Sequence, residues 1–310
     1  DAVVASPEWA AVPDHPVDAF TRRAITDVLA AEGAEFTVVN GWERAEFFKP
    51  SADFHVTHGF KFDEAHSIVA AEVAAVQNAV GLTEVNGFNR MEISGTDAHS
   101  FLDRMSCSKI KSTPGRVSLA YLLNHHGMVK GEMTVANLPD GRIWAGSAAA
   151  AEWHDRDWLN LHIRADEDVK VSSLTNDYTI LLLAGPKSRD VLSAVSRGDW
   201  SAEGFPWLSV REAFMGIAPA VVMSVRFSGE LAYEIHVPNA QLYAAYRELR
   251  AAGTAGVRGD RLSVRAHRVG QLADGVAAAV QRAAALGLPR LEVAAVAAAA
   301  RSGAMEEDLM

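Results

Sequence analysis

The sequence predicts an α+β fold in which helices cover one face of antiparallel sheets. Short strand patterns alternate irregularly with one-sided helices, which favours this class over a doubly wound parallel sheet. A strand–glycine–helix unit also occurs twice, because Gly95 and Gly185 are each followed, at offsets of six and seven, by a pair of core-type residues. We interpret this repeat as a weak internal duplication. The length of 310 residues allows more than one domain.

The first part of the chain gives two helices and a strand. Residues 1–32 are punctuated by prolines and are interpreted as a lead-in segment. A helix is predicted before Gly81, since valines recur at positions 69, 73, 76 and 80 and therefore share one face. A strand is predicted over Val85–Ser94, and it leads through a glycine into a second helix with apolar residues on one face.

A meander of strands is predicted between the two units, with turns at Asn124–Gly127 and Pro139–Gly141. The second unit is followed by two more strands and a helix. In order, the predicted elements are strands at 119–123, 128–137 and 142–147, a helix at 151–163, a strand at 180–184 with a helix after Pro186, strands at 219–227 and 231–237, and a helix from 239 to about 251.

The composition changes near Gly253. From Ala251 to Met310 there are 18 alanines and seven arginines, but no lysine and no aromatic residue. We therefore treat residues 253–310 as a separate tail of atypical composition. Two interpretations stay open: an alanine-rich helical appendage, or sequence foreign to the fold, such as an out-of-frame end or a chimeric join. No functional residue is assigned there.

Charge and cysteine content exclude several classes of protein. The 29 basic and 39 acidic side chains give a formal net charge of −10, which argues against a broad nucleic-acid surface. The single cysteine, Cys107, excludes a disulfide framework and a cysteine-only zinc site, and it favours a reducing compartment, the cytoplasm. No apolar run reaches the roughly 18 residues of a membrane span, so no membrane partner is expected.

Familiar catalytic motifs are missing from the sequence. It has no Walker loop, no G-x-G-x-x-G after a strand, no H-E-x-x-H and no G-x-S-x-G, so nucleotide-binding and serine-hydrolase classes lose support. The pair His55 and His58 and the cluster His154, Asp155 and Asp157 are weak metal candidates. Because three converging ligands are needed and none is demonstrated, no metal is predicted.

Two strand glutamates are more informative. Alternation sets Glu132 and Thr134 on the face of their strand opposite to Met133, and it sets Glu234 opposite to the apolar face of its own strand. Each carboxylate could simply face water. If both polar faces line one cavity, however, one carboxylate could pair with two adjacent N–H donors and the other could position or deprotonate a reacting amine.

Six stretches in a fixed order carry a family resemblance. They are GWER (41–44), AVQNAVGL (75–82), FNRMEISGTDAHSFLDRM (88–105), LNHHGMVKGEMTVANLPDG (123–141), LLAGPKSRDVL (182–192) and SGELAYEIHVP (228–238). With them the sequence resembles the folate-binding aminomethyltransferase family, whose type member is the aminomethyltransferase of the glycine cleavage system. It looks most like the C-terminal folate domain of dimethylglycine and sarcosine dehydrogenases.

The resemblance implies a fold and a set of site residues. It implies two interlocked ferredoxin-like lobes over residues 33–252, with the family's C-terminal barrel absent or unrecognisable. It implies tetrahydrofolate as the cofactor, Glu132 as the catalytic carboxylate where glycine-cleavage members usually carry Asp, and Glu234 as the pterin-binding glutamate. The other implied cofactor-binding residues are Asn124, Thr134 and Phe227.

The implied function is tetrahydrofolate-dependent one-carbon transfer. The carbon of an N-methylated glycine, or of its iminium product, would pass to the folate to give 5,10-methylenetetrahydrofolate. FAD is expected only if a flavin-binding domain precedes this chain or a flavin-binding subunit accompanies it. Two alternatives stay open: a non-catalytic folate-binding or regulatory module, which the change from Asp to Glu132 favours, and a truncated fragment without activity.

Overall fold

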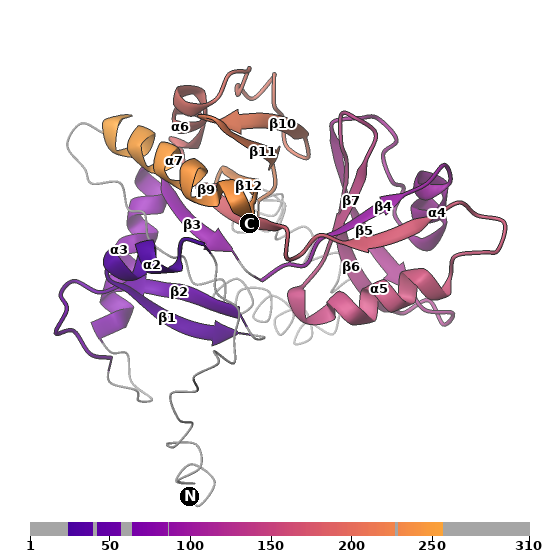
Figure 1. Cartoon of the computed structure of the whole chain (residues 1–310), viewed down its shortest axis with the longest axis horizontal. Helices are drawn as coiled ribbons and strands as arrows, with labels where there is room; N and C mark the ends of the chain where they lie inside the picture. Colours follow the sequence, from indigo (N-terminus) through magenta and orange to yellow (C-terminus); the bar gives the residue numbers. More distant parts are fainter. Residues whose placement is uncertain (1–23, 40–41, 57–63, 86, 227–228, 257–310) are drawn as a thin grey trace, which may run out of the picture.

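Two five-stranded antiparallel sheets and a separate two-stranded sheet form the molecule (Figure 1). The computed structural model describes residues 24–39, 42–56, 64–85, 87–226 and 229–256. Helices cover one face of each large sheet, as the predicted α+β class requires. No closed barrel is found in the part of the chain just given. The predicted α+β class is confirmed, and the two large sheets form two lobes.

The second lobe is built from one continuous stretch of chain. Its sheet has the order β5-β6-β7-β4-β8, and it forms the right-hand side of Figure 1. Its elements are β4 (Met91–Ser94), α4 (Ala98–Met105), β5 (Arg116–Leu123), β6 (Val129–Asn137), β7 (Ile143–Gly146), a short 3-10 turn (Ala149–Ala151), α5 (Glu152–Leu161) and β8 (Lys170–Ser173).

The first lobe combines a strand from before the second lobe with the chain that follows it. Its sheet has the order β10-β11-β12-β9-β3. Its elements are β3 (Gly81–Val85), β9 (Tyr178–Ala184), α6 (Ser188–Val195), β10 (Val210–Met215), β11 (Ala218–Met223), β12 (Ala232–Pro238), a short 3-10 turn (Asn239–Gln241) and α7 (Leu242–Gly256). The second lobe is therefore inserted into the first.

The residues before β3 pack onto the first lobe. They form α2 (Thr26–Ala31), β1 (Ala34–Val39), β2 (Trp42–Phe48) and α3 (Glu64–Asn78). The helix expected from the valine spacing is α3. Ile25 and Leu29 are buried in the core of the first lobe, so the end of the segment interpreted as a lead-in contributes to that core. The predicted domain boundaries stay predictions.

The two sheets repeat one arrangement. In the second lobe, the meander β5-β6-β7 pairs with the earlier strand β4, which pairs with the edge strand β8. In the first lobe, the meander β10-β11-β12 pairs with the earlier strand β9, which pairs with the edge strand β3. β4 and β9 each run through a glycine into a helix, and these glycines have the similar positive φ angles of 111° at Gly95 and 119° at Gly185. The structure agrees with the duplication predicted from the sequence.

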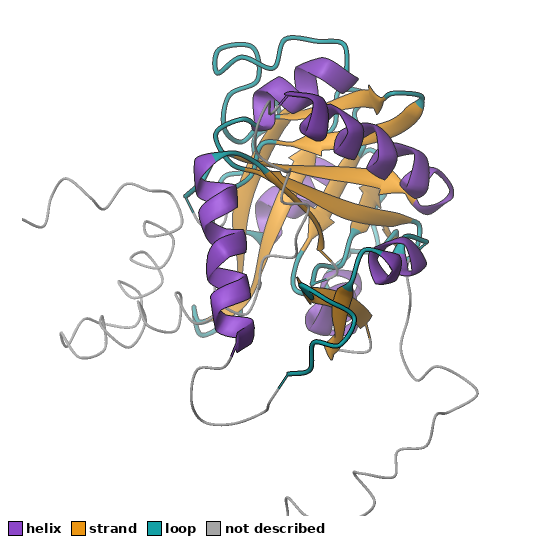
Figure 2. Ribbon diagram, turned by 90° about the vertical axis from the view of Figure 1, so that its left-hand side faces the viewer, coloured by secondary structure: helices purple, strands orange, loops and turns teal. Residues whose placement is uncertain are grey.

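Each sheet has a helix-covered outer face and an inner face turned toward the other lobe. Figure 2 shows helices in front of the strands of the first lobe. Alternation in the strands produces this division, since Tyr233, Ile235 and Val237 of β12 pack with α6 and α7 while the residues between them face inward. The core between the lobes contains Val117, Ala136, Leu138 and Trp144 from the second lobe and Val210, Val221, Met223 and Val225 from the first.

The chain passes between the lobes twice, and the two crossings are hydrogen-bonded to each other. The first crossing lies between β3 and β4, and the second between β8 and β9. The backbone nitrogen of Arg90 donates to Oγ1 of Thr175 at 3.0 Å, and the backbone nitrogen of Leu174 donates to the carbonyl of Arg90 at 2.8 Å. These contacts hold the two inner faces at a fixed position relative to each other.

The prediction of one strand over Val85–Ser94 is wrong. β3 ends at Val85 in the first lobe, β4 begins at Met91 in the second, and the residues between them form the first crossing. Alternation of side chains does not reveal where a chain leaves one sheet for another, because the pattern on both sides of the break is that of a strand.

The strands β1, β2, β8 and β10 were not predicted, and of β3 only the last residue, Val85, was. β8 and β10 lie at sheet edges, where the burial pattern that marks a strand is weaker. The predicted tail lies outside the described residues from position 257 onward. Within the described ranges, no helix has both the length and the apolar character needed to cross a bilayer.

Substituting the two repeated glycines tests the lobe architecture. A Cβ at Gly95 would lie 2.0 Å from the carbonyl oxygen of Asp168, and one at Gly185 would lie 2.4 Å from that of Val76. In both variants the free-energy cost of a left-handed alanine adds to the cost of the clash with the carbonyl oxygen. Gly95→Ala and Gly185→Ala should therefore each lower the free energy of unfolding, measured by urea denaturation, by about 3 kcal/mol or more. Gly141→Ala is the control.

Gly141 has the same sign of φ, at +89°, but no atom lies within 4 Å of its missing Cβ. Its substitution should therefore cost only the backbone penalty of about 1–2 kcal/mol. Equal losses in all three variants would contradict the close approach at the two strand–helix junctions.

Candidate functional site

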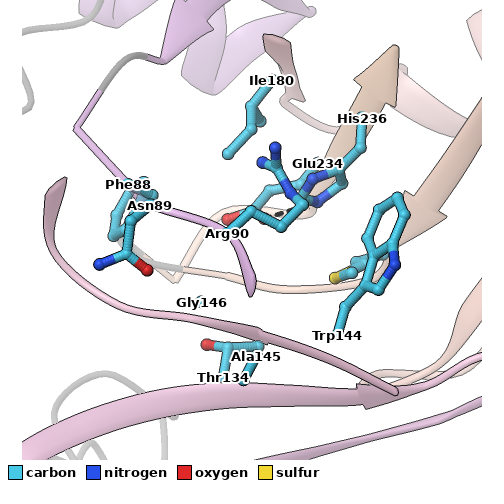
Figure 3. A pocket seen from close by; sticks show the side chains of 11 residues that line it. Phe88, Asn89, Arg90, Thr134, Trp144, Ala145, Gly146, Ile180, Glu234 and His236 are labelled. Carbon is cyan, nitrogen blue, oxygen red and sulfur yellow. Dashed lines mark hydrogen bonds and ion pairs between the residues drawn. The ribbon is translucent and has the colours of Figure 1, made fainter. Parts of the chain in front are cut away.

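A pocket lies where the inner faces of the two sheets meet (Figure 3). β9, β11 and β12 form its wall on the first lobe, β6 and β7 form its wall on the second, and the first crossing closes one side. The cavity itself measures about 40 Å³, and the larger space of about 380 Å³ between the lining side chains includes open solvent. Its polar side chains are Asn89, Arg90, Thr134, Glu234 and His236, and the ring of Trp144 forms an apolar wall.

Glu234 and His236 project from β12 into this pocket. They alternate with the residues that β12 sends into the outer core, so both must face inward. Glu234 is 7% exposed and His236 is 3% exposed. Nε2 of His236 lies 3.1 Å from Oε2 of Glu234, and the pair forms a buried hydrogen bond. The predicted pterin-binding glutamate therefore lies in a cavity, bonded to a histidine.

His236 is neutral at ordinary pH. Burial lowers its pKa to about 4, the positive charge of Arg90 lowers it as well, and the contact with Glu234 opposes both effects. A neutral imidazole carries one N–H and one acceptor nitrogen. Because an ionised carboxylate only accepts, Nε2 carries the proton toward Glu234 and Nδ1 is left as an acceptor.

Arg90 occupies the centre of the site. It is 3% exposed, and its guanidinium carbon lies 5.8 Å from the ring centre of Trp144 and 5.9 Å from that of Tyr178. Contacts of this kind with two aromatic faces suit the planar, weakly hydrated guanidinium. The two crossings fix its backbone, so a buried cation is held beside Glu234 and His236.

A buried network fixes the second polar wall of the pocket. Nδ2 of Asn89 donates to Oγ of Ser147 at 2.7 Å, and the backbone nitrogen of Ser147 donates to Oδ1 of Asn89 at 3.1 Å. Oγ of Ser147 donates in turn to Oδ2 of the buried Asp155 at 2.5 Å. These bonds orient the Asn89 amide, so its position depends on α5 as well as on the crossing.

The other predicted site residues have different positions. Thr134 lines the pocket from β6. Glu132 is half-buried and lies two residues further along the same face of β6, about 7 Å away along the strand, beyond the residues that line the pocket. Oδ1 of Asn124 accepts from the backbone nitrogens of His126 and Met128, so this side chain closes the turn. Phe227 lies outside the described residues.

Arg90, His236, Trp144 and Asn89 were not among the predicted site residues. His236 could have been found from the sequence, because the alternation that sets Glu234 inward sets His236 inward as well. Arg90 and Asn89 could not have been found from the sequence, because the pattern there predicts one continuous strand. Within the described ranges, no group of three metal-ligating side chains is found.

The fold and sequence match known proteins. Residues 25–265 match the family model described as the GCVT N-terminal domain. Dimethylglycine dehydrogenase, mitochondrial, of Rattus norvegicus is 26% identical over 215 residues, which are 69% of this chain and 25% of that protein. The pyruvate dehydrogenase phosphatase regulatory subunit, mitochondrial, of Mus musculus is 27% identical over 234 residues, which are 73% of this chain and 27% of that protein.

A solved structure supports the same fold. The glycine cleavage system aminomethyltransferase T from Bartonella henselae superposes with a TM-score of 0.59 at 19% sequence identity, covering 73% of this chain and 55% of that one. At this level of identity the likeness concerns the fold. The chain spans about a quarter of the length of the curated relatives it matches.

The buried histidine predicts a pH dependence of stability. Between its ordinary pKa of 6.5 and its folded pKa of about 4, the unfolded chain binds more protons at this position than the native protein does. Above pH 6.5 the neutral His236 therefore makes its full contribution, about 3 kcal/mol, to the free energy of unfolding. This contribution is lost as the pH falls toward 4. Urea denaturation of the wild type and of His236→Gln across this range measures it.

The variant should lose stability less steeply than the wild type as the pH falls. His126→Gln, which removes an exposed histidine from the β5–β6 turn, is the control for the change in composition. Parallel curves for the wild type and His236→Gln would show that His236 does not titrate as a buried group.

Proposed function

The chain belongs to the GCVT N-terminal domain family, and on that premise we propose that it is a tetrahydrofolate-dependent one-carbon transfer domain. The observation that supports this most directly is that Thr134 and Glu234, from different sheets, line one pocket, and that Glu132 shares the face of Thr134. The donor would be an N-methylated glycine or its iminium product, and the product would be 5,10-methylenetetrahydrofolate.

The side chains of the pocket fit a reduced pterin. A pterin is a flat ring with an amino group beside a ring N–H, and a carboxylate matches two such adjacent donors. Glu234 supplies the carboxylate in a site that is largely closed to water. Trp144 supplies a flat apolar wall. Nδ1 of His236 is buried without a hydrogen-bond partner among the described residues, which is what a site for a polar ligand would leave.

Each protein group then has a separate task. Bound tetrahydrofolate supplies a ring nitrogen as the nucleophile for the incoming carbon. Glu234 binds and orients the ring, and the buried guanidinium of Arg90 lines the same pocket. The network of Asn89, Ser147 and Asp155 holds the opposite wall in position.

Glu132 takes the part of the base in this proposal. It lies beyond the pocket wall on the inner face of β6 and is half-buried, so it can reach both the ligand and water. A carboxylate there can hold or remove a proton from a reacting amine. Glu132 and Glu234 therefore have different roles in this mechanism, since the half-buried Glu132 exchanges protons and the buried Glu234 binds the ring.

The whole protein's reaction includes partners outside this chain. The relatives' length leaves room for further domains, and the oxidation that generates the carbon unit calls for a flavin-binding domain or subunit. FAD therefore belongs to the proposal only through such a partner.

A second candidate is a folate-binding regulatory module without transfer activity. Similarity to a subunit named as regulatory, of a pyruvate dehydrogenase phosphatase, supports it, as does Glu132 in a position where the resemblance implies Asp. Both candidates bind tetrahydrofolate, and only the first transfers carbon.

Ligand binding is tested by thermal melting of the full chain with tetrahydrofolate. At 100 times Kd a ligand that binds only the native state adds about 2.7 kcal/mol, which should raise Tm by about 5–10 °C for a domain of this size. Glu234→Gln should lose most of the shift because it removes the charged acceptor. Glu132→Gln is the matched control and should keep it. No shift in the wild type would contradict both candidates.

Transfer is tested with Glu132→Ala. Formation of 5,10-methylenetetrahydrofolate is measured from dimethylglycine, with a dimethylglycine-oxidising flavoprotein as the source of the carbon unit. The variant should lose at least about 100-fold in rate, the ordinary contribution of a general base, while the melting shift with tetrahydrofolate persists. An unchanged rate would remove Glu132 from the mechanism, and no transfer by the wild type would favour the regulatory candidate.

A further inference from the structure

His236 has a ring nitrogen for which the protein supplies no partner. Its Nδ1 is buried and makes no hydrogen bond within the described part of the chain, whereas its Nε2 contacts Glu234 at 3.1 Å. The residue lines the pocket between the sheets (Figure 3). Leaving a buried polar atom unpaired costs about 1–3 kcal/mol, so such atoms usually have a ligand or an ordered water as their partner.

The protonation of the pair determines what this nitrogen can bind. Because a carboxylate accepts hydrogen bonds, the bond between Glu234 and His236 assigns the ring proton to Nε2. Nδ1 of the neutral ring is then an acceptor. The pocket therefore offers two kinds of acceptor from one strand, a carboxylate and an imidazole nitrogen.

We propose that His236 is a second ligand-binding residue of the site, whose Nδ1 accepts an N–H of the bound pterin in addition to the donors that Glu234 takes. This inference rests on the proposed function. The pterin would then be recognised by two acceptors on β12, the carboxylate of Glu234 and Nδ1 of His236. Such a site selects rings that carry more than two N–H donors on the edge facing β12. A ring with fewer donors leaves Nδ1 unpaired and binds less tightly.

A positioning role for His236 makes a different prediction. In that case the imidazole would matter only through Nε2, which donates to Glu234 and fixes its carboxylate. The two roles use different ring nitrogens, and two amide side chains separate them. Glutamine can keep a donor near the position of Nε2 and lacks an acceptor at Nδ1, whereas asparagine can keep an acceptor near Nδ1 and cannot reach Glu234.

The test is calorimetric titration of the full chain with 5-formyltetrahydrofolate, a stable reduced folate. We expect His236→Gln to bind about tenfold more weakly than the wild type, the loss of one hydrogen bond worth about 1.4 kcal/mol. His236→Asn should stay within about threefold of the wild type. Glu234→Gln is the reference for loss of the main binding group, and the melting temperature of each free variant verifies folding.

The outcomes separate this inference from the function on which it rests. Binding by the wild type that weakens in His236→Gln more than in His236→Asn supports the ligand contact. The reverse order, or wild-type affinity in His236→Gln, overturns the contact and leaves the folate site intact. Absence of binding by the wild type overturns the proposed function, and this inference with it.

A measurement on the wild type covers the case in which the variants do not fold. In protein labelled with ¹⁵N-histidine, the unprotonated ring nitrogen of His236 should shift upfield on saturation with 5-formyltetrahydrofolate, because its lone pair then accepts a hydrogen bond. Histidines outside the pocket, such as the exposed His126, serve as internal controls. An unchanged His236 signal at saturation would exclude the contact.

Discussion

The double crossing between the lobes is the constraint on which the site depends. The two segments that join the sheets are hydrogen-bonded to each other at Arg90, Leu174 and Thr175, and this fixes how the inner faces meet. Arg90 is both a part of this junction and a wall of the pocket. The same backbone that joins the lobes therefore holds the cation next to Glu234 and His236.

The inner faces carry polar groups where a structural interface would carry apolar ones. A buried cation, carboxylate and histidine cost free energy unless they are paired, and hydrophobic side chains of similar size would often be at least as stable. The core between the lobes, with Trp144, Val221 and Met223, shows that the interface can be apolar next to the pocket. The polar cluster is therefore better explained by binding than by stability, and the unpaired nitrogen of His236 agrees with this.

The two carboxylates differ in their exposure to water. β12 is a central strand with both faces covered, so Glu234 is buried and bonded to a neighbour. Glu132 of β6 is half-buried. One fold thus has one carboxylate in a buried environment and a second with partial access to water, which are the conditions that the proposed binding and proton-transfer roles require.

Local pattern was enough to predict the repeated strand–glycine–helix units, the meander of β5, β6 and β7, and the position of Glu132, Thr134 and Glu234 opposite to the apolar faces of their strands, because these follow from side-chain period and from the backbone freedom of glycine. The break between Val85 and Met91 and the position of Arg90 could not be predicted, since a strand pattern carries no information on which sheet a strand joins. The sequence by itself determined which side chains share a face. Only the tertiary structure decided which faces meet, because that depends on contacts between residues far apart in the chain, such as Arg90 with Thr175. Thr134 and Glu234 line one pocket as a result.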